Sequence, residues 1–347
     1  MPITVRSFAK INLGLRIGAL RSDGFHELRT VYQTIALHDI LSVQVGRGSG
    51  IEIRCEDPRV PKNDSNTCYR IAERTMAVLK ARGRVVIEIK KRLPVQGGLG
   101  GASANAVATL LALEQALKKK LSAPERLRIA ANVGSDLPLF LIGGTILGIG
   151  RGEEVYPLQD LPAIPCVIAT PEIGVSTPKA FADWDELIGR ASNLHAGAAA
   201  YSKLTLPPAS DRMSEFGRVL SAWLGGQSQY LHKQVKYKSG RALSGVPVSK
   251  GRGRAETPLL DLVRTGIEND FERVVFPKYP ELREVKGGLE RAGAVYGSLS
   301  GSGSAIYGLF ASREAAVKAA ARLREDGTPA VATTTLTRQQ YWNKIFD

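Results

Sequence analysis

Residues 94–117, PVQGGLGGASANAVATLLALEQAL, decide the fold, because they leave a strand, pass through a glycine-rich loop and enter a helix. Four glycines lie within residues 97–101, and apolar residues recur at helical spacing in the second half of the stretch. Such a loop brings several backbone N–H groups onto one anion, and the helix dipole adds about half a positive charge at the same point. Residues 97–103 therefore predict a phosphate-binding loop.

This loop matches neither of two common nucleotide-binding motifs. No Gly-Lys-Ser/Thr follows it, as a P-loop requires, and GLGGAS interrupts the GxGxxG pattern of dinucleotide-binding folds. The alternative is a flexible turn that packs closely against the helix, which would explain one or two glycines. The dense glycines, followed by Ser103 and Asn105 at the start of the helix, favour phosphate binding.

Two charged residues interrupt apolar segments and are candidates for catalysis. Asp136 lies in GSDLPLF, between a turn of small residues and an apolar stretch, and Lys10 lies in the strand-like segment SFAKINLGL. A buried ionised Asp needs a partner or a function. Asp136 is expected to accept the proton of an attacking hydroxyl, with Lys10 as the cation that keeps it charged. The alternatives are a helix cap for Asp136 and a solvated strand lysine for Lys10.

A second glycine-rich segment lies near the C-terminus. In SLSGSGSAIYGLF, Gly301 and Gly303 lie between two apolar strands, so the backbone can approach a ligand closely. A simple hairpin is the alternative.

The rest of the chain alternates between strand and helix patterns. Strands are predicted at residues 3–17, 28–37, 40–45, 51–55, 84–93, 165–172 and 329–337. Helices are predicted at residues 66–83, 122–134, 177–187, 211–224, 259–275, 280–293 and 312–327. Ser122 and Glu125 have the spacing of a capping box. The C-terminal order of elements suits a sheet covered by helices on one face.

A length of 347 residues predicts two domains, with the first ending near residue 160. The second, residues 161–347, is interrupted by a basic insertion at about 190–257, where ten Lys or Arg oppose three acidic residues within 191–257. Residues 231–254 carry seven basic residues and no acidic one, and we expect them to be mobile. The net charge of +14 suits phosphorylated substrates and nucleic acid alike.

Composition predicts a cytoplasmic protein without a membrane span. No apolar run approaches the ~18 residues that a span needs, and the N-terminus alternates like a strand instead of resembling a secretory signal. Cys55, Cys68 and Cys166 are odd in number and lack CxxC spacing, which suits a reducing compartment.

Together, the lysine-bearing strand, the phosphate loop, GSDLPLF and the C-terminal glycine loop resemble the GHMP kinases. Within that superfamily the segments AKINLGLRI, RSDGFHELRTVYQTIALHD and KRLPVQGGLGGASANA look like the branch that acts on 4-diphosphocytidyl-2-C-methyl-D-erythritol. DGFHEL is the strongest discriminator, because homoserine, mevalonate and galactose kinases lack this segment. The resemblance covers residues 1–184 and 258–347.

The resemblance implies an α+β fold of GHMP kinase architecture, with an N-terminal ribosomal protein S5 domain 2-like domain and a C-terminal ferredoxin-like domain. It implies ATP-dependent phosphorylation, with Mg²⁺, of the 2-hydroxyl of the cytidine-linked substrate in non-mevalonate (MEP) isoprenoid biosynthesis. Lys10 and Asp136 match the catalytic pair. The residues implied at ATP are Asn66, Lys91, Pro94, Gly97, Gly98, Leu99, Gly100, Gly101, Ala102 and Ser103. Metal ligands are not implied, although Ser103 is a candidate.

At the acceptor, the resemblance implies Phe25, His26, Asp136, Thr177 and Phe181. His26 matches a residue that hydrogen-bonds the cytosine edge and Phe181 an aromatic that stacks on the base, which is how a pocket reads a pyrimidine. Ordinary core packing is the alternative for both phenylalanines.

The chain departs from the family pattern at Gln96, where a small residue is common, at Phe25, where tyrosine is common, and at the insertion. The rival functions are another GHMP kinase, such as homoserine or mevalonate kinase, and a nucleic-acid-binding protein. The basic stretch has few aromatics and the kinase motifs lie elsewhere, so nucleic acid is disfavoured. A monomer or a homodimer is expected.

Overall fold

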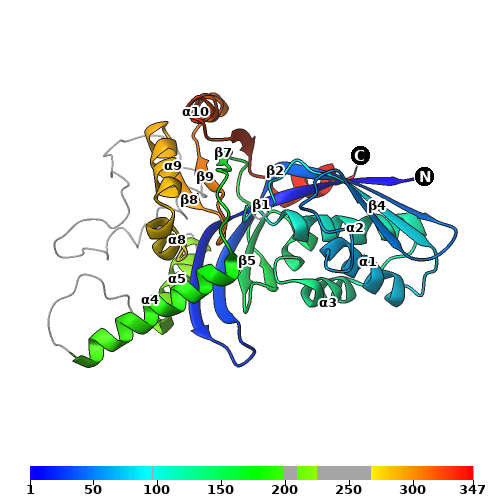
Figure 1. The fold of residues 1–347 in the computed structure, drawn as a ribbon, viewed down its shortest axis with the longest axis horizontal. Coiled ribbons are helices and arrows are strands. Elements are labelled where there is room, and N and C mark those ends of the chain that lie inside the picture. Colours follow the sequence, from blue (N-terminus) through cyan, green and yellow to red (C-terminus); the bar gives the residue numbers. More distant parts are fainter. Residues whose placement is uncertain (96, 198–208, 225–266, 347) are drawn as a thin grey trace.

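The computed structural model describes residues 1–95, 97–197, 209–224 and 267–346. Two sheets, each with its own helices, lie at opposite ends of an elongated molecule (Figure 1). A long hairpin of strands β1 (Ile3–Leu20) and β2 (His26–Gly46) begins in one half and reaches into the other. Among the described residues, no helix is long and apolar enough to cross a membrane.

The first sheet is built on this hairpin. Its order is β3-β4-β2-β5-β6, with β1 paired to β2; the strands are β3 (Ile51–Cys55), β4 (Arg84–Lys90), β5 (Thr145–Ile149) and β6 (Glu154–Pro157). β3 and β4 are parallel and the other pairs antiparallel. The separate strands predicted at 28–37 and 40–45 are one strand, because β1 pairs along most of its length while β4 and β5 pair with its two ends.

Strand β1 is irregular around its charged residue. Its register against β2 shifts between Phe8 and Lys10 and again between Asn12 and Gly14. Such bulges bend a strand and re-aim its side chains. Residues 10–12 therefore lie between two local departures from the regular ladder.

Three helices cover one face of the first sheet: α1 (Thr67–Val78), α2 (Gly101–Leu117) and α3 (Ala123–Val133). The predicted Ser122–Glu125 capping box is confirmed. Helix α1 was predicted to continue to residue 83 but ends at Val78, and the left-handed φ of 48° at Lys80 is incompatible with a continuing helix. Helix α2 is buried along most of its length, which fixes the phosphate loop at its start.

The second sheet confirms the ferredoxin-like prediction. Its antiparallel order is β10-β7-β9-β8, from β7 (Pro165–Ala169), β8 (Tyr296–Leu299), β9 (Ile306–Leu309) and β10 (Ala330–Thr334). Helices α8 (Glu272–Lys278) and α9 (Pro280–Arg291) join β7 to the β8–β9 hairpin, and α10 (Arg313–Glu325) joins β9 to β10. This order is the βαββαβ pattern.

Of the helix predicted at 259–275, the described residues confirm only 272–275, the start of α8. Residues 259–266 lie outside the described residues, and from Ile267 the chain is not helical: Asn269 bridges Leu15, and α8 begins only at Glu272. Because Asn269 donates to the carbonyls of Leu299 and Gly301, its segment is held against β1 and the glycine loop. These tertiary hydrogen bonds override the helical pattern.

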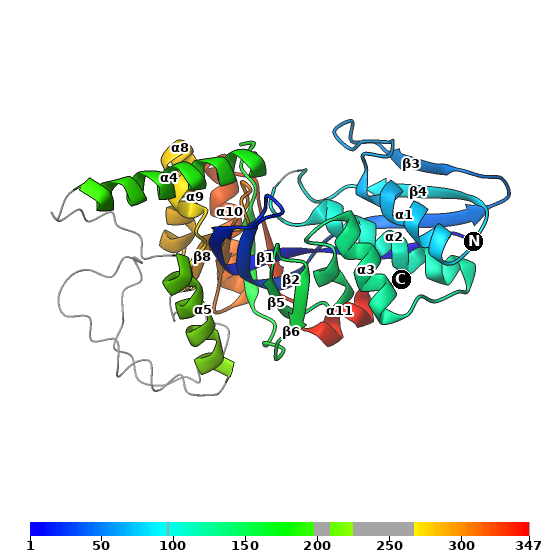
Figure 2. The same ribbon diagram turned by 90° about the horizontal axis from the view of Figure 1, so that it is seen from below.

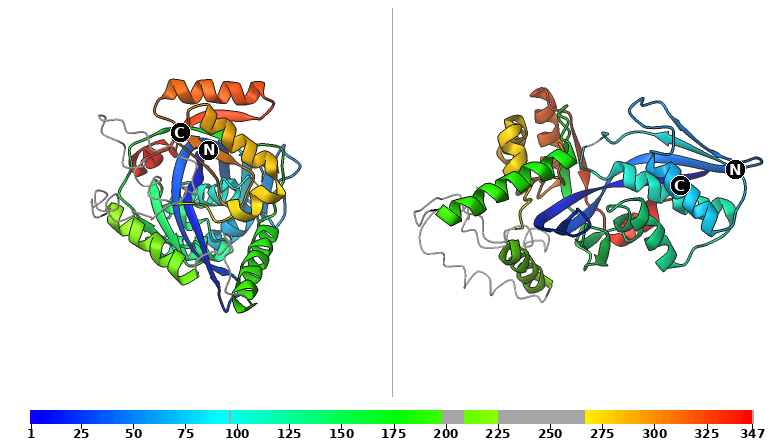
Figure 3. Two further views of the ribbon diagram at one scale, coloured as in Figure 1. Left: turned by 90° about the vertical axis from the view of Figure 1, so that its left-hand side faces the viewer. Right: turned by 60° about the horizontal axis from the view of Figure 1, so that its bottom comes forward.

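Regular structure is present within the described part of the predicted insertion. Helix α4 (Thr177–Gly197) extends beyond the predicted residue 187, and α5 (Ala209–Leu224) confirms the helix predicted at 211–224. The two helices flank the tip of the β1–β2 hairpin (Figure 3). Phe216 and Leu220 of α5 share a buried cluster with Leu13 of β1. The stretch 231–254 lies outside the described residues.

A last helix, α11 (Arg338–Lys344), was not predicted and returns to the first sheet (Figure 2). Buried Tyr341 donates to the carbonyl of Phe140 at 2.7 Å, and Phe346 bridges Val5. Its sequence signal was a capping box: the side chain of Thr337 caps the amide of Gln340, whose side chain returns to the Thr337 amide.

Candidate active site

The glycine loop meets helix α2 in the conformation that a phosphate-binding loop requires. Gly98 and Gly100 have φ of 77° and 71°, and Gly100 is the N-cap of α2 without a side-chain hydrogen bond. The first turn of α2 contains no acidic residue. Its first backbone N–H groups therefore have no capping side chain and can bind an anion.

A cavity of about 340 Å³ opens over this loop. It is lined by all ten residues predicted to contact ATP, namely Asn66, Lys91, Pro94, Gly97, Gly98, Leu99, Gly100, Gly101, Ala102 and Ser103. It is also lined by Asn105, which the sequence placed at the start of the helix, and by seven residues that the sequence did not indicate, namely Arg59, Val60, Pro61, Ser65, Thr67, Cys68 and Val95. Gln96 lies outside the described residues.

The two glycine-rich loops pack against each other. A Cβ on Gly98 would lie 2.1 Å from the carbonyl oxygen of Ser300, and one on Gly303 would lie 2.4 Å from the Gly98 amide nitrogen. Ser300 Oγ donates to the Gly98 carbonyl at 3.0 Å, and the Ala305 amide donates to the Gly97 carbonyl at 3.1 Å. The C-terminal segment is thus a hairpin, as the simpler alternative held, whose loop also supports the phosphate loop.

Asp39 anchors the entry to the phosphate loop, although nothing in the sequence analysis singled it out. It is fully buried and accepts hydrogen bonds from the amides of Arg92 and Leu93 at 2.7 and 2.8 Å. Lys91 Nζ binds the same carboxylate at 2.5 Å, as does Asn105 Nδ2 at 3.0 Å. Lys91 therefore reaches the cavity with its charge already partly neutralised.

Two asparagine side chains at the cavity differ in how many of their polar atoms have hydrogen-bond partners. Asn66 caps α1 through the Cys68 amide at 2.8 Å and donates to the Pro61 carbonyl at 2.6 Å, so both of its polar atoms serve the fold. The buried Oδ1 of Asn105 has no hydrogen-bond partner among the described residues. Buried acceptors are normally satisfied, so Asn105 is a position where a ligand donor would fit.

Lys10 and Asp136 meet beside the loop, as the sequence predicted they should. Lys10 Nζ lies 3.4 Å from Asp136 Oδ2 and donates to Asn12 Oδ1 at 2.6 Å. Lys10 is 3% exposed, whereas the Asp136 side chain is 34% exposed and accessible to a substrate. The Lys10 amide donates to the Leu99 carbonyl at 2.9 Å, which fixes the ion pair against the glycine loop.

Tyr32 completes the surroundings of the carboxylate and was missed by the sequence analysis. Its hydroxyl donates to Asp136 Oδ1 at 3.1 Å, and its ring centroid lies 5.5 Å from Lys10 Nζ. Burial, and then the neighbouring Asp136 charge, raises the pKa of Tyr32 well above its ordinary value. Tyr32 therefore stays protonated and acts as a hydrogen-bond donor, so each oxygen of Asp136 has a polar partner.

The predicted base-reading residues gather between the hairpin tip and helix α4. The rings of His26 and Phe181 stack with centroids 5.1 Å apart and planes 13° apart, and Phe271 packs edge-on against Phe181 at 5.0 Å. His26 Nε2 lies 2.7 Å from Asp185 Oδ1, a contact that the sequence did not indicate. Phe25 is 51% exposed, which is more than core packing allows.

Thr177, the remaining predicted acceptor residue, is the first residue of α4 and lies four residues before Phe181. Its hydroxyl is hydrogen-bonded to Ser302 Oγ at 2.7 Å. Because Ser302 belongs to the C-terminal glycine loop, Thr177 joins the start of α4 to the wall of the phosphate site. The structure thus brings the acceptor residues to two neighbouring places, one at the hairpin tip and one beside the glycine loops.

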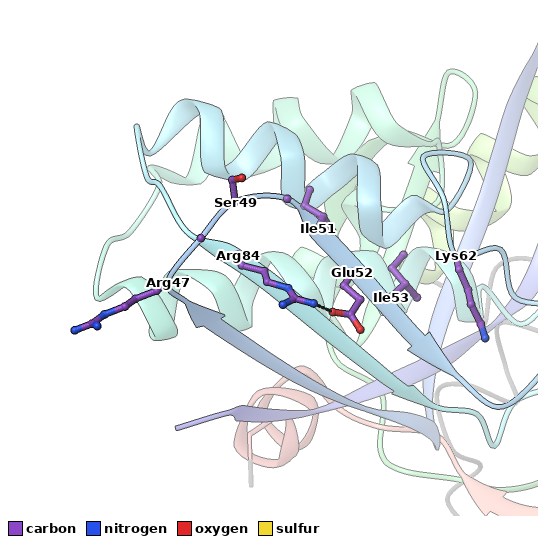
Figure 4. A pocket seen from close by; sticks show the side chains of 9 residues that line it. Arg47, Ser49, Ile51, Glu52, Ile53, Lys62 and Arg84 are labelled. Carbon is purple, nitrogen blue, oxygen red and sulfur yellow. Dashed lines mark hydrogen bonds and ion pairs between the residues drawn. The ribbon is translucent and has the colours of Figure 1, made fainter.

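A second hollow, of about 670 Å³, contains no predicted site residue. It lies over β3 and β4, where Glu52 pairs with Arg84 while Arg47 and Lys62 point away to either side (Figure 4). Within the described ranges, no group of three or more His, Cys, Asp or Glu is placed to hold a metal ion.

Comparison with family models matches both halves of the chain. Residues 66–144 match the GHMP kinases N terminal domain, and residues 256–328 match the GHMP kinases C terminal domain. The first match includes the phosphate loop and Asp136, and the second includes the C-terminal glycine loop.

Curated relatives match over nearly the whole chain. The 4-diphosphocytidyl-2-C-methyl-D-erythritol kinase of Solibacter usitatus (strain Ellin6076) is 37% identical over 324 residues, covering 93% of this chain and 86% of the relative. The enzyme of the same name from Rhodococcus jostii (strain RHA1) is 33% identical over 327 residues, covering 94% and 89%. These matches extend through residues that the sequence analysis assigned to an insertion outside the resemblance.

Solved structures agree with these relatives. A crystal structure of 4-(cytidine 5'-diphospho)-2C-methyl-D-erythritol kinase matches with a TM-score of 0.67 at 28% identity, covering 96% of this chain and 98% of the other. Homoserine kinase from Cytophaga hutchinsonii matches with a TM-score of 0.64 at 21% identity, covering 98% and 96%. The second likeness shows the shared fold alone.

Proposed function

Because the chain belongs to the 4-diphosphocytidyl-2-C-methyl-D-erythritol kinases of the GHMP superfamily, we propose that Lys10 and Asp136 transfer the ATP γ-phosphoryl group to this acceptor. The acceptor group is its 2-hydroxyl, and the reaction is a step of non-mevalonate isoprenoid biosynthesis. The observation that carries the proposal is the 3.4 Å contact between Lys10 and Asp136 beside the start of α2.

Each side chain has a distinct role in the proposed transfer. Asp136, exposed on one side, accepts the proton of the hydroxyl as oxygen attacks phosphorus. Lys10 keeps Asp136 ionised and lies near the transferred group, where negative charge accumulates. Tyr32 and Lys10 hold the two carboxylate oxygens in place. Phosphoryl transfer depends mainly on positioning and charge neutralisation, which are what these contacts supply.

The nucleotide is proposed to bind in the cavity over the glycine loop, with its phosphates at the first turn of α2. Mg²⁺ on the triphosphate would supply further charge neutralisation. The Ser103 hydroxyl lines the cavity in that first turn and fits such an ion, since Mg²⁺ combines few protein oxygens with phosphate and water ligands.

The cytosine is proposed to bind at Phe25, His26 and Phe181. Support comes from the exposed ring of Phe25 beside the stacked pair of His26 and Phe181, since a planar base binds best against aromatic faces. Homoserine and mevalonate carry no base and have no use for these rings. The rival nucleic-acid function rested on the S5-like fold and on the basic stretch 231–254, and that stretch lies outside the described residues.

We also propose a cytoplasmic enzyme acting as a monomer or homodimer. Its three cysteines are free thiols, which suits a reducing compartment.

The test is ATP consumption by the purified protein with 4-diphosphocytidyl-2-C-methyl-D-erythritol, beside homoserine, mevalonate and a reaction without acceptor. We expect turnover with the cytidine substrate alone, and ³¹P NMR of the product should show a new phosphomonoester on the 2-hydroxyl. Turnover with homoserine or mevalonate in its place would refute the assignment of the acceptor.

A further inference from the structure

The turn between β5 and β6, residues 150–153, lies between the two parts of the acceptor site. Gly150 and Gly152 have φ of 69° and 99°, so the residue between them, Arg151, sits in a tight turn with a left-handed glycine on each side. The Gly150 carbonyl accepts a hydrogen bond from the Leu28 amide at 2.6 Å. The turn is therefore fixed to β2, close to the hairpin tip.

On one side, this turn contacts the proposed reaction centre. A Cβ on Gly152 would lie 2.4 Å from the Tyr32 hydroxyl and 4.0 Å from Asp136 Oδ1. The backbone next to Arg151 is thus in van der Waals contact with the groups that hold the reacting hydroxyl.

On the other side, the Arg151 side chain reaches the proposed base site. Its guanidinium carbon lies 4.9 Å from the centroid of the Phe25 ring. The pKa of Asp23 at the hairpin tip is lowered, first by the hydrogen bond from the Phe25 amide and also by the charges of Arg21 and Arg151. The turn therefore approaches the surroundings of Asp136 through Gly152 and Phe25 through Arg151.

The acceptor places two phosphate groups between its base and its reacting hydroxyl, because its diphosphate joins the cytidine to the methylerythritol unit. A diphosphate needs cationic donors, and a guanidinium can bind phosphate oxygens in a bidentate manner. Lys10 already contacts Asp136 and Asn12, and Arg21 is paired with Asp23 and Glu27.

Arg151 has fewer polar contacts than Lys10 or Arg21. Glu153 accepts from its Nε at 3.1 Å, while no described residue accepts a hydrogen bond from its two terminal nitrogens. Its side chain is 30% exposed, so part of it is accessible from solvent.

We propose that Arg151 binds the diphosphate of the acceptor and thereby sets the distance between the base site and the reacting hydroxyl. The inference rests on the proposed function, since it requires a cytidine diphosphate acceptor. Arg151 is a binding residue for substrate and takes no part in proton transfer.

The experiment compares cytidine with cytidine diphosphate as competitive inhibitors against the acceptor at saturating ATP. Arg151→Gln is expected to raise the inhibition constant of cytidine diphosphate roughly 10- to 100-fold, the usual range for a lost charge-assisted hydrogen bond. The constant for cytidine is expected to change less than about threefold, because cytidine has no phosphate for Arg151 to contact. Arg151→Lys should recover part of the loss, since it keeps the charge without the planar fork.

Arg54→Gln is the matched control, because Arg54 is 58% exposed on β3 away from both sites, and it should leave both constants unchanged. The KM for ATP and the melting temperature verify that each variant is folded. Equal weakening of cytidine and cytidine diphosphate in Arg151→Gln would overturn the inference, since it would mean that Arg151 only supports the Phe25 ring. Failure of both compounds to inhibit the wild-type enzyme would overturn the acceptor assignment itself, and the inference with it.

Discussion

The nucleotide cavity and the acceptor site are built in different ways. The cavity is lined by two stretches, residues 59–68 and 91–105, and its proposed phosphate-binding groups are backbone amides held by glycines. The proposed acceptor site instead draws side chains from β1, β2, α4, the segment around Asp136 and the β5–β6 turn. Substitutions in the first region therefore act through backbone geometry, whereas those in the second remove individual contacts.

The largest expected effect is at the junction of the two regions. Asp136→Asn keeps the shape of the side chain but cannot accept the proton, so kcat should fall about 10²- to 10⁴-fold. Because Asp136 does not line the nucleotide cavity, ATP affinity measured by calorimetry should change little. Turnover of Asp136→Asn near the wild-type rate would contradict this prediction, since it would show that the reaction needs no proton acceptor at residue 136.

The second prediction concerns the nucleotide cavity, where backbone geometry is expected to matter most. Gly98→Ala places a Cβ 2.1 Å from the Ser300 carbonyl oxygen at a φ of 77°, so the two glycine loops must separate. We expect the KM for ATP to rise about tenfold or more and the melting temperature to fall by several degrees. Gly174→Ala, where a Cβ meets nothing within 4 Å, is the control. An unchanged KM for ATP would show that contact between the loops does not shape the phosphate site.

A smaller effect is expected at Tyr32, the hydrogen-bond donor to the proposed catalytic carboxylate of Asp136. Tyr32→Phe removes the hydroxyl that contacts Asp136 at 3.1 Å but keeps the buried ring, so kcat should fall about tenfold with both KM values little changed. Steady-state kinetics with each substrate varied in turn separates these parameters. A change confined to KM would place Tyr32 in binding instead of positioning.

Phe181→Leu tests a single side-chain contact in the proposed acceptor site. Losing an aromatic face beside His26 should raise the KM for the cytidine acceptor about 3- to 10-fold, as for other stacking contacts. The KM for ATP should stay constant. Equal increases in both KM values would mean that Phe181 supports the whole second sheet and has no specific role at the base.

The smallest effect concerns a thiol on the wall of the nucleotide cavity. Burial raises the pKa of Cys68 from 9.0 to about 12, so the thiol is neutral and unreactive at physiological pH. Because the unfolded thiol ionises first, its contribution to stability is full below about pH 9 and declines as pH rises from about 9 to 12. Iodoacetamide at pH 8 should leave Cys68 unlabelled until denaturant is added, as followed by mass spectrometry. Labelling of Cys68 in the folded protein would indicate that the cavity opens and exposes this thiol.

The sequence predicted well those parts that depend on local pattern. The glycine loop and the Ser122–Glu125 box follow from spacing and turn residues, whereas the ferredoxin-like order of the second sheet was implied by the family resemblance. Helix α11 was missed although Thr337 and Gln340 carry the same signal as Ser122 and Glu125. The division into domains near residue 160 remains a prediction, and α11 lies against the first sheet despite its place at the C-terminus.

The contacts that position the candidate site residues were harder to predict from the sequence. Asp39 is a buried charged residue within an apolar strand. The same pattern singled out Lys10, so Asp39 could have been predicted in the same way. Tyr32 and Asp185 gave no such signal, because a tyrosine in a strand and an aspartate on a helix are ordinary. Their roles depend on contacts between segments far apart in the chain, which no local pattern encodes.

The irregular register of β1 has a consequence for how this protein can vary in length. Lys10 and Asn12 lie between two register shifts, so the direction of both side chains depends on the number of residues in the strand as well as on their identity. A single inserted or deleted residue here would turn every side chain that follows it in the strand to the opposite face. Substitutions in β1 that keep its apolar character should therefore be easier to accept than any change in its length, whereas the exposed turn at residues 21–24 leaves room for one.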